Sequence, residues 1–258
     1  MIEVRNLTKS FDGRTVLNDI STIFDEGKTN LIIGRSGSGK TVLLKNVIGL
    51  VTPDAGEIIF DGRSITDMSK RDILNLRREM GLLFQGSALF DSMTVLENVM
   101  FPLDMFSEKP SRKRRERAMS CLERVDLSKE TYNLYPSEIS GGMMKRAAIA
   151  RAIVLQPKYL FCDEPNSGLD PKTALIIDDL IFGITKEYGI TTVINTHDMN
   201  SVMNIGESII FIKDGIKEWS GTKEQVINSN NKYLEDFIFA SDLLRKAKEI
   251  EGEQQREG

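Results

Sequence analysis

The pattern of apolar and polar positions predicts strands in the first and last thirds of the chain. In the first third, short apolar runs bounded by turn residues favour strands at residues 2–5, 15–17, 20–24, 31–33, 57–60 and 80–84. In the last third, apolar runs at 159–162 and 191–196 flank a helical segment at 174–188, and residues 209–216 have the pattern of a closing hairpin. Strand, helix and strand in this order predict parallel pairing through a right-handed crossover.

The middle of the chain, residues 86–156, has the apolar spacing of helices instead. We therefore expect one α/β domain over residues 1–235, with a core made of 1–85 and 157–235 and a helical subdomain inserted at 86–156. A tail follows at 236–258. Amphipathic spacing at 233–250 predicts a helix that packs on its own subunit, or clasps a neighbouring subunit or a small accessory protein.

Residues 34–41 form the clearest chemical motif. Their sequence, Gly34-Arg35-Ser36-Gly37-Ser38-Gly39-Lys40-Thr41, fits the pattern G-x-x-x-x-G-K-[ST] between an apolar strand and an amphipathic helix. Glycines let the backbone N–H groups face an anion, and the following helix adds its positive N-terminal end. Lys40 can reach the β- and γ-phosphates, and the Thr41 hydroxyl can bind Mg²⁺. The motif predicts binding of a nucleoside triphosphate.

Composition narrows the class of protein. The 258 residues carry a formal net charge of -4, so charge does not indicate a nucleic acid as partner. Cys121 and Cys162 have no metal-ligand spacing, and we expect free thiols in a reducing cytoplasm. The N-terminus lacks a signal-peptide pattern, and no apolar run approaches the roughly 20 residues that cross a bilayer. Any membrane role is expected through a partner.

Two carboxylates and a histidine follow predicted strands. Asp163 and Glu164 end the strand at 159–162, and behind a phosphate loop this position predicts Asp163 in the Mg²⁺ shell and Glu164 as general base. His197, the only histidine, ends the strand at 191–196, where parallel α/β folds face their ligand. We expect His197 to sense the γ-phosphate; a structural histidine is the alternative.

Ser140-Gly141-Gly142 precedes a strong helix at 145–153 and forms a second candidate anion site. The alternative is a simple helix cap, because serine and glycine both suit that position.

With these motifs in order, the chain resembles the nucleotide-binding subunits of ABC transporters over about residues 2–230. The matching positions are Phe11, the loop 34–41, Gln85, Ser140-Gly141-Gly142, Asp163-Glu164, Ser167-Gly168-Leu169-Asp170 and His197. The resemblance implies an α/β P-loop NTPase (RecA-like) core with an antiparallel β subdomain and an inserted α-helical subdomain. It implies a head-to-tail homodimer that buries ATP between one subunit's loop and the other's Ser140-Gly141-Gly142.

The resemblance also implies roles for single residues. Phe11 would stack on adenine, with a place in the core as the alternative, and Asp170 would lie near the dimer seam. Gln85 would contact Mg²⁺ or the lytic water and link the core to the helical part. The implied catalytic residues are Lys40, Gln85, Glu164 and His197, and the implied metal ligands are Thr41, Gln85 and Asp163.

Two stretches narrow the resemblance within the family. Residues 83–99, and 140–146 with Met143 in place of the family's usual glutamine, are similar to the MlaF-type ATPases of Mla/Mce phospholipid transporters. The similarity implies ATP-driven phospholipid transport between the inner and outer membranes, with the chain on the cytoplasmic side of the bacterial inner membrane. The implied partners are an MlaE-like integral permease, an MlaD-like MCE-domain protein and no nucleic acid.

Other functions stay open. The chain could serve an ABC transporter of another small solute such as an amino acid, which sequence separates only weakly from a lipid. A soluble ABC ATPase of DNA repair or ribosomes is disfavoured, because such proteins carry a long coiled-coil insertion or two cassettes.

Two surface features have no assigned partner. A basic run at 109–117 predicts a solvated helix face, or else contact with anionic headgroups or an acidic partner. Phe90, Met93 and Phe101 are candidates to contact a permease helix docked near residues 84–100, with core packing as the alternative.

Overall fold

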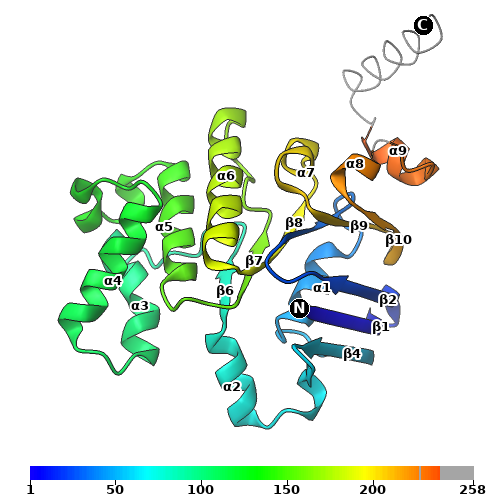
Figure 1. Ribbon diagram of the computed structural model, residues 1–258, viewed down its shortest axis with the longest axis horizontal. Coiled ribbons are helices and arrows are strands. Elements are labelled where there is room, and N and C mark those ends of the chain that lie inside the picture. The colour runs from blue at the N-terminus through cyan, green and yellow to red at the C-terminus, as the bar shows by residue number, and fades with distance from the viewer. Residues whose placement is uncertain (227, 239–258) are drawn as a thin grey trace, which may run out of the picture.

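Two β-sheets with a helix between them form the centre of the molecule (Figure 1). The computed structural model describes residues 1–226 and 228–238. The larger sheet has the order β10-β9-β3-β8-β7-β6. Its strands are β3 (Thr29–Ile33), β6 (Met80–Leu83), β7 (Tyr159–Asp163), β8 (Thr191–Thr196), β9 (Ser208–Lys213) and β10 (Ile216–Gly221). All neighbours pair in parallel except β9 and β10, which confirms the predicted crossover and the closing hairpin.

The smaller sheet is antiparallel, with the order β2-β1-β4-β5. Its strands are β1 (Ile2–Phe11), β2 (Arg14–Phe24), β4 (Ala55–Phe60) and β5 (Arg63–Ser64). The prediction of separate strands at 15–17 and 20–24 was wrong, because β2 runs through both. The pairing of β2 with β1 is irregular at this point: the register shifts between Leu7 and Lys9 of β1, and Asp19 of β2 has a positive φ of 53°. This irregularity interrupts the apolar pattern of β2 without ending the strand.

Helix α1 (Lys40–Val47) is packed between the two sheets. Adjacent residues of β3 point to opposite faces, as strand geometry requires. Ile32 joins the α1 side with the antiparallel sheet, whereas Leu31 and Ile33 join the core on the other face. The larger sheet is therefore covered by apolar side chains on both faces, so polar functional side chains can lie only at the ends of its strands.

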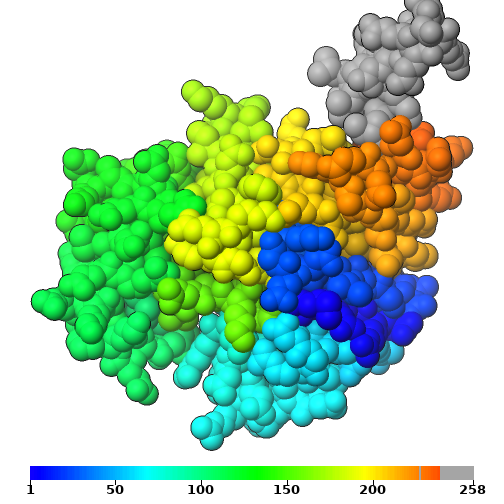
Figure 2. Space-filling view, in the orientation of Figure 1, coloured from blue at the N-terminus to red at the C-terminus, as the bar shows by residue number. Residues whose placement is uncertain are grey.

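The remaining helices lie on both faces of the larger sheet: the first packs on the α1 side through Leu76, and the others cover the opposite face and extend it into a helical lobe. They are α2 (Lys70–Arg78), α3 (Val95–Phe106), α4 (Ser111–Arg124), α5 (Gly141–Ile153), α6 (Pro171–Tyr188), α7 (Met199–Ile205), α8 (Lys223–Val226) and α9 (Lys232–Ile238), with short 3-10 turns at Ile65–Asp67, Lys129–Asn133 and Pro136–Glu138. Helices α3, α4 and α5 pack on one another and form the green lobe of Figure 2. Thr94 and Glu97 start α3 with a capping box.

Some elements differ from the predictions. Helices α2 and α7 were not predicted, because α2 buries only Leu76 and α7 is too short for a clear apolar period. The helix predicted at 233–250 begins at Lys232, and its residues from 239 onward lie outside the described part. Leu234 and Ile238 of α9 are buried in the core, so the expected domain limit at residue 235 falls inside a helix.

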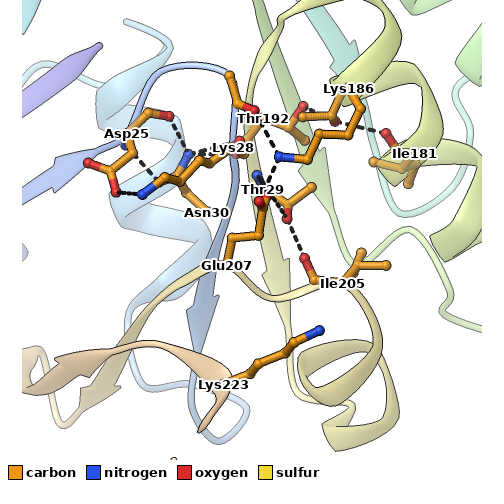
Figure 3. A network of polar contacts seen from close by, with 12 residues as sticks. Asp25, Lys28, Thr29, Asn30, Ile181, Lys186, Thr192, Ile205, Glu207 and Lys223 are labelled. Carbon is orange, nitrogen blue, oxygen red and sulfur yellow. Dashed lines mark hydrogen bonds and ion pairs between the residues drawn. The ribbon is translucent and has the colours of Figure 1, made fainter. Parts of the chain in front are cut away.

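A polar network fastens the N-terminal end of β3 (Figure 3). The Thr29 hydroxyl donates to the Ile205 carbonyl, and the Glu207 carboxylate accepts from the Thr29 backbone N–H at 2.9 Å. Lys186 of α6 forms an ion pair with Glu207 at 2.6 Å, and Asn30 donates to the Thr192 carbonyl at 3.1 Å. The network holds β3, β8 and α6 together, so the other end of β3 enters the loop at residue 34 from a fixed position.

Replacing Gly81 of β6 by alanine should destabilise the fold. A Cβ there would lie 2.4 Å from the Ala152 carbonyl oxygen of α5, so the strand and the helix would have to separate. Such overpacking costs about 1–3 kcal/mol, and urea unfolding would measure it. Gly86→Ala is the matched control, because its Cβ would lie more than 4 Å from every group other than its chain neighbours in the described part of the chain. Equal stability of the two variants would contradict the close packing of β6 on α5.

Candidate functional site

The loop 34–41 is shaped by glycines that no other residue could replace. Gly34 has φ 150°, and a Cβ there would lie 2.2 Å from the Ile212 carbonyl oxygen of β9. Gly39, the N-cap of α1, has φ 108°, and its Cβ would lie 2.8 Å from a methyl group of Leu17. The loop thus turns tightly against both sheets before α1 begins.

Lys40 lies inside this loop. Its side chain is 4% exposed, and its ammonium donates to the carbonyl oxygens of Gly34 at 2.8 Å and Arg35 at 3.0 Å. Burial lowers the pKa of Lys40, while the charges of Glu164 and Asp163 oppose that change. A cation held at the centre of a loop of backbone N–H groups is suited to a polyphosphate.

Thr41 and Asp163 come together from opposite parts of the sequence. The Thr41 hydroxyl donates to Asp163 Oδ1 at 3.2 Å, and Asn195 Nδ2 donates to the same oxygen at 3.0 Å. A hydroxyl beside a carboxylate is a hard oxygen pair of the kind Mg²⁺ prefers, so these residues fit the expected metal. The Ser38 hydroxyl is buried and has no hydrogen-bond partner among residues 1–226 and 228–238, so it can donate to a phosphate oxygen held by the loop.

Glu164 and His197 face each other beyond Asp163. His197 Nδ1 lies 3.1 Å from Glu164 Oε1, and the histidine side chain is 58% exposed, which argues against a structural histidine in the core. Glu164 has a φ of 47°, a left-handed conformation that is uncommon for a glutamate. Both residues line a cavity of about 770 Å³, together with Arg35, Ser36 and Ser167.

Gln85 is joined to the same region. Its side-chain amide donates to the Ser167 hydroxyl at 3.0 Å. The backbone around it is held by α5, because Lys145 donates to the Gln85 carbonyl and Arg151 donates to the carbonyls of Ser87 and Ala88 at 2.7 Å. Gln85 therefore lies where the core meets the helical lobe.

Sequence reasoning missed the residues that hold the loop after Glu164. Asn166 Nδ2 donates to Asp178 Oδ1 of α6 at 2.7 Å and to the Ser201 hydroxyl of α7 at 3.1 Å. Burial raises the pKa of Asp178 to about 6, and Asp198 and Asp179 add to the rise. One sequence signal could have predicted this contact: Asp178 lies on the same helix face as Ile181, where a charged residue is buried only if it has a partner.

Ser140-Gly141-Gly142 and Asp170 occupy helix N-termini. The Ser140 hydroxyl accepts from the Met143 N–H at 3.3 Å and caps α5, and Asp170 caps α6. A Cβ on Gly142 would lie 2.8 Å from a methyl group of Thr173, so the two N-termini lie side by side. In Figure 1, α5 and α1 lie on opposite sides of α6. Within one subunit, the candidate anion site at Ser140-Gly141-Gly142 therefore lies away from the loop 34–41.

The predicted aromatic and apolar positions are on the surface. Phe11 ends β1 with 43% of its side chain exposed and with the Lys9 ammonium 5.3 Å from its ring centre, so it is not a core aromatic. Phe90 is 42% exposed and contacts the ring of Phe101 at 4.8 Å. Met93 is half-buried. Cys121 and Cys162 are free thiols, as expected, and the structure shows that both are buried.

A glycine loop around a buried lysine, with Thr41 and a strand-end Asp-Glu pair beside it, defines a P-loop ATPase. The chain belongs to the ABC transporter family, whose sequence profile matches residues 17–167. Its enzymatic activity is ATP hydrolysis coupled to transport. No helix in the described ranges, 1–226 and 228–238, is long and apolar enough to span a bilayer.

Three relatives illustrate the range of the family. The phospholipid transport ATP-binding protein MlaF of Haemophilus influenzae is 37% identical over 238 residues, covering 92% of this chain and 90% of MlaF. The probable ribonucleotide transport ATP-binding protein Mkl of Mycobacterium leprae is 36% identical, covering 92% of this chain and 68% of Mkl. The methionine import protein MetN of Clostridium acetobutylicum is 36% identical, covering 94% of this chain and 75% of MetN.

Two solved structures share the fold. The ATP-binding cassette MJ0796, seen as a dimer bound to ADP and phosphate after hydrolysis, superposes with a TM-score of 0.79 at 34% identity over 86% of this chain and 99% of its own. CbiO1 of Clostridium perfringens, part of the CbiONQ transporter complex, gives a TM-score of 0.82 at 30% identity over 97% of this chain and 98% of its own. These likenesses confirm the predicted fold class.

Asp178→Asn should change how stability depends on pH. Because the folded pKa of Asp178 is raised to about 6, above the ordinary value of about 3.9 for an aspartate, the wild type should lose stability as pH rises from 4 through 6. Asparagine keeps an acceptor for Asn166 but cannot ionise, so its stability relative to wild type should rise by on the order of 2–3 kcal/mol between pH 4 and pH 7.

Chemical denaturation across this pH range would measure the effect. The control substitution is Asp67→Asn, at an exposed aspartate of the turn Ile65–Asp67, which should leave the pH profile like that of the wild type. Parallel profiles for wild type and Asp178→Asn would show that the Asp178 carboxyl ionises as freely as in water.

Proposed function

We propose that this chain is the ATP-binding and hydrolysing subunit of a phospholipid-transporting ABC transporter at the bacterial inner membrane. It acts from the cytoplasmic side as a homodimer, with an integral permease and an MCE-domain protein as partners. Its core comprises residues 1–85 and 157–238, so that it includes all of α9, and residues 86–156 form the helical subdomain. The observation that carries the ATPase assignment is the meeting of Thr41 with Asp163 and of Glu164 with His197.

The phospholipid assignment is supported by the similarity to MlaF, which is matched over nearly its whole length. It is also supported by Met143, where the family usually has a glutamine. The Met143 side chain is half-buried and packs against the core, so this position contributes apolar contact rather than an amide at the seam. The similarity to MetN makes an amino acid the alternative cargo.

The homodimer is supported by the separation of the two anion-binding elements. Ser140-Gly141-Gly142 lies beside Thr173 and the start of α6 rather than with the residues that line the cavity at the loop. In a head-to-tail pair, the helix N-terminus at Gly141 would reach the nucleotide held by the other subunit's loop. The related cassette MJ0796 is itself dimeric with ADP and phosphate bound.

The residues divide the reaction between them. The loop N–H groups and Lys40 hold the β- and γ-phosphates, and Phe11 stacks on adenine. Thr41, Gln85 and Asp163 would hold Mg²⁺, whose charge would offset that of the phosphates. Glu164 takes a proton from the attacking water, and His197, 3.1 Å away, orients that water toward the γ-phosphate.

The helical subdomain would pass the closing motion to the permease. Gln85 is bonded to Ser167 on one side and held by Lys145 of α5 on the other, so a shift at the nucleotide moves the start of the lobe. Asn98, fully buried, bonds the carbonyls of Phe90 and Met93 at 3.1 and 3.0 Å and stiffens the segment that carries the exposed Phe90. We place the permease contact on this segment.

Glu164→Gln should abolish turnover while ATP stays bound. The amide cannot accept the water proton, so the rate should fall by roughly 10²–10⁴-fold, and ATP should hold the dimer closed. Phosphate release and size-exclusion chromatography with ATP would measure the two effects.

Lys40→Ala should lose both nucleotide affinity and ATP-driven dimerisation, because the shared site cannot form.

Glu130→Gln, at an exposed glutamate of the helical lobe, is the matched control and should hydrolyse ATP normally. Normal turnover in Glu164→Gln would overturn the assignment of the base. Dimerisation on ATP in Lys40→Ala would overturn the shared site.

The cargo is tested by what co-purifies with the chain from membranes. We expect an integral permease, an MCE-domain protein and bound phospholipid, identified by mass spectrometry of proteins and lipids. A soluble solute-binding protein with a permease, and no bound phospholipid, would instead assign an importer of a small solute. The ATPase assignment would survive that outcome.

A further inference from the structure

The turn between α3 and α4 carries exposed apolar side chains at its start. Met105 is 59% exposed and Phe106 is 43% exposed, and they are consecutive at the end of α3. Leu103, one turn earlier, is buried in the core. The apolar stripe of α3 therefore continues past the core and out onto the surface.

Cations surround this apolar tip. Residues 104–117 hold six basic and three acidic side chains, in a chain whose net charge is -4. Asp104 is paired with Arg114 at 2.9 Å. Lys109, Lys113 and Arg115 are exposed and form no ion pair with any residue of 1–226 or 228–238. We call residues 105–115 the basic corner.

Helix α2 extends the basic corner with the same chemistry. The Arg78 guanidinium lies over the Phe106 ring at 5.4 Å, which joins the two elements. On the same face of α2, Leu74 is 55% exposed and Arg71 is exposed. Figure 1 shows α2 and the α3–α4 turn toward the same side of the molecule.

The basic corner is also hollowed. A cavity of about 540 Å³ opens there, with Leu103, Phe106, Val154 and Leu155 as apolar lining. Its charged lining has four basic side chains and one acidic one, namely Lys109, Lys113, Arg114, Arg117 and Glu108. An anionic amphiphile matches this division, because its apolar part can lie on the hydrophobic wall while its phosphate meets the ammonium groups.

We propose that the basic corner binds the anionic surface of a phospholipid membrane. Met105 and Phe106 enter the boundary between headgroups and acyl chains, and Lys109, Lys113 and Arg115 pair with lipid phosphates. A protein partner fits less well, since the centres of protein interfaces are depleted of lysine. This binding goes beyond the proposed transport function and does not depend on which cargo is moved.

Flotation of the purified chain with vesicles tests the proposal. The wild type should float with vesicles of equal parts phosphatidylglycerol and phosphatidylcholine, and weakly with phosphatidylcholine alone. Lys109→Glu combined with Lys113→Glu should reduce binding at least about tenfold, because each basic residue near an anionic surface contributes about fivefold. Met105→Ser with Phe106→Ser should weaken binding with the charge unchanged.

Lys129→Glu with Lys232→Glu is the matched control, because it makes the same change in charge beyond the far end of α4 and on α9. It should bind vesicles like the wild type, and all variants should still bind ATP. Equal loss in both double variants would overturn the proposal, as would a wild type that floats with neither vesicle. Loss of the permease from the Lys109→Glu/Lys113→Glu complex, with a wild type that ignores vesicles, would assign the corner to a protein.

Discussion

The buried ammonium of Lys40 is the constraint on which the site depends. A charge removed from water is costly, and here it is compensated by two loop carbonyls and by the nearby charges of Asp163 and Glu164. That compensation requires β3 and β7, which lie on either side of β8, to end at the same edge of the sheet, and this in turn requires the parallel sheet and its apolar faces. The fold can thus be understood as the scaffold that places one cation between a loop and two carboxylates.

Beyond this centre, the site is held by contacts that join elements distant in sequence. Asn166 ties the segment after Glu164 to α6 and α7, while Lys145 and Arg151 of α5 hold the backbone after Gln85. Each contact is made by a buried or half-buried polar side chain whose desolvation is offset by a specific partner. Because these contacts link the site to α5, α6 and α7, a shift of the nucleotide-binding residues would move those helices as well. Such linkage is what coupling ATP hydrolysis to transport requires.

The chain presents two different surfaces on its helical side. One is the aromatic segment around Phe90, stiffened by the buried Asn98, and the other is the basic corner at residues 105–115. They differ in chemistry, since the first is apolar and supported by hydrogen bonds, whereas the second combines apolar tips with unpaired cations. This difference is a physical reason to assign them to different partners, a permease and a lipid surface.

The loop 34–41, the Asp-Glu pair, the parallel sheet and the family could be predicted from the sequence, because they depend on local spacing and on apolar runs. The three-dimensional packing was needed to show that Glu164 faces His197, that Asn166 bonds Asp178, and that Ser140 to Gly142 lie apart from their own loop. It also revealed α2 and joined the two parts of β2. The reason is that apolar periodicity reports which face of an element is buried, whereas polar contacts between distant segments depend on how those elements are packed.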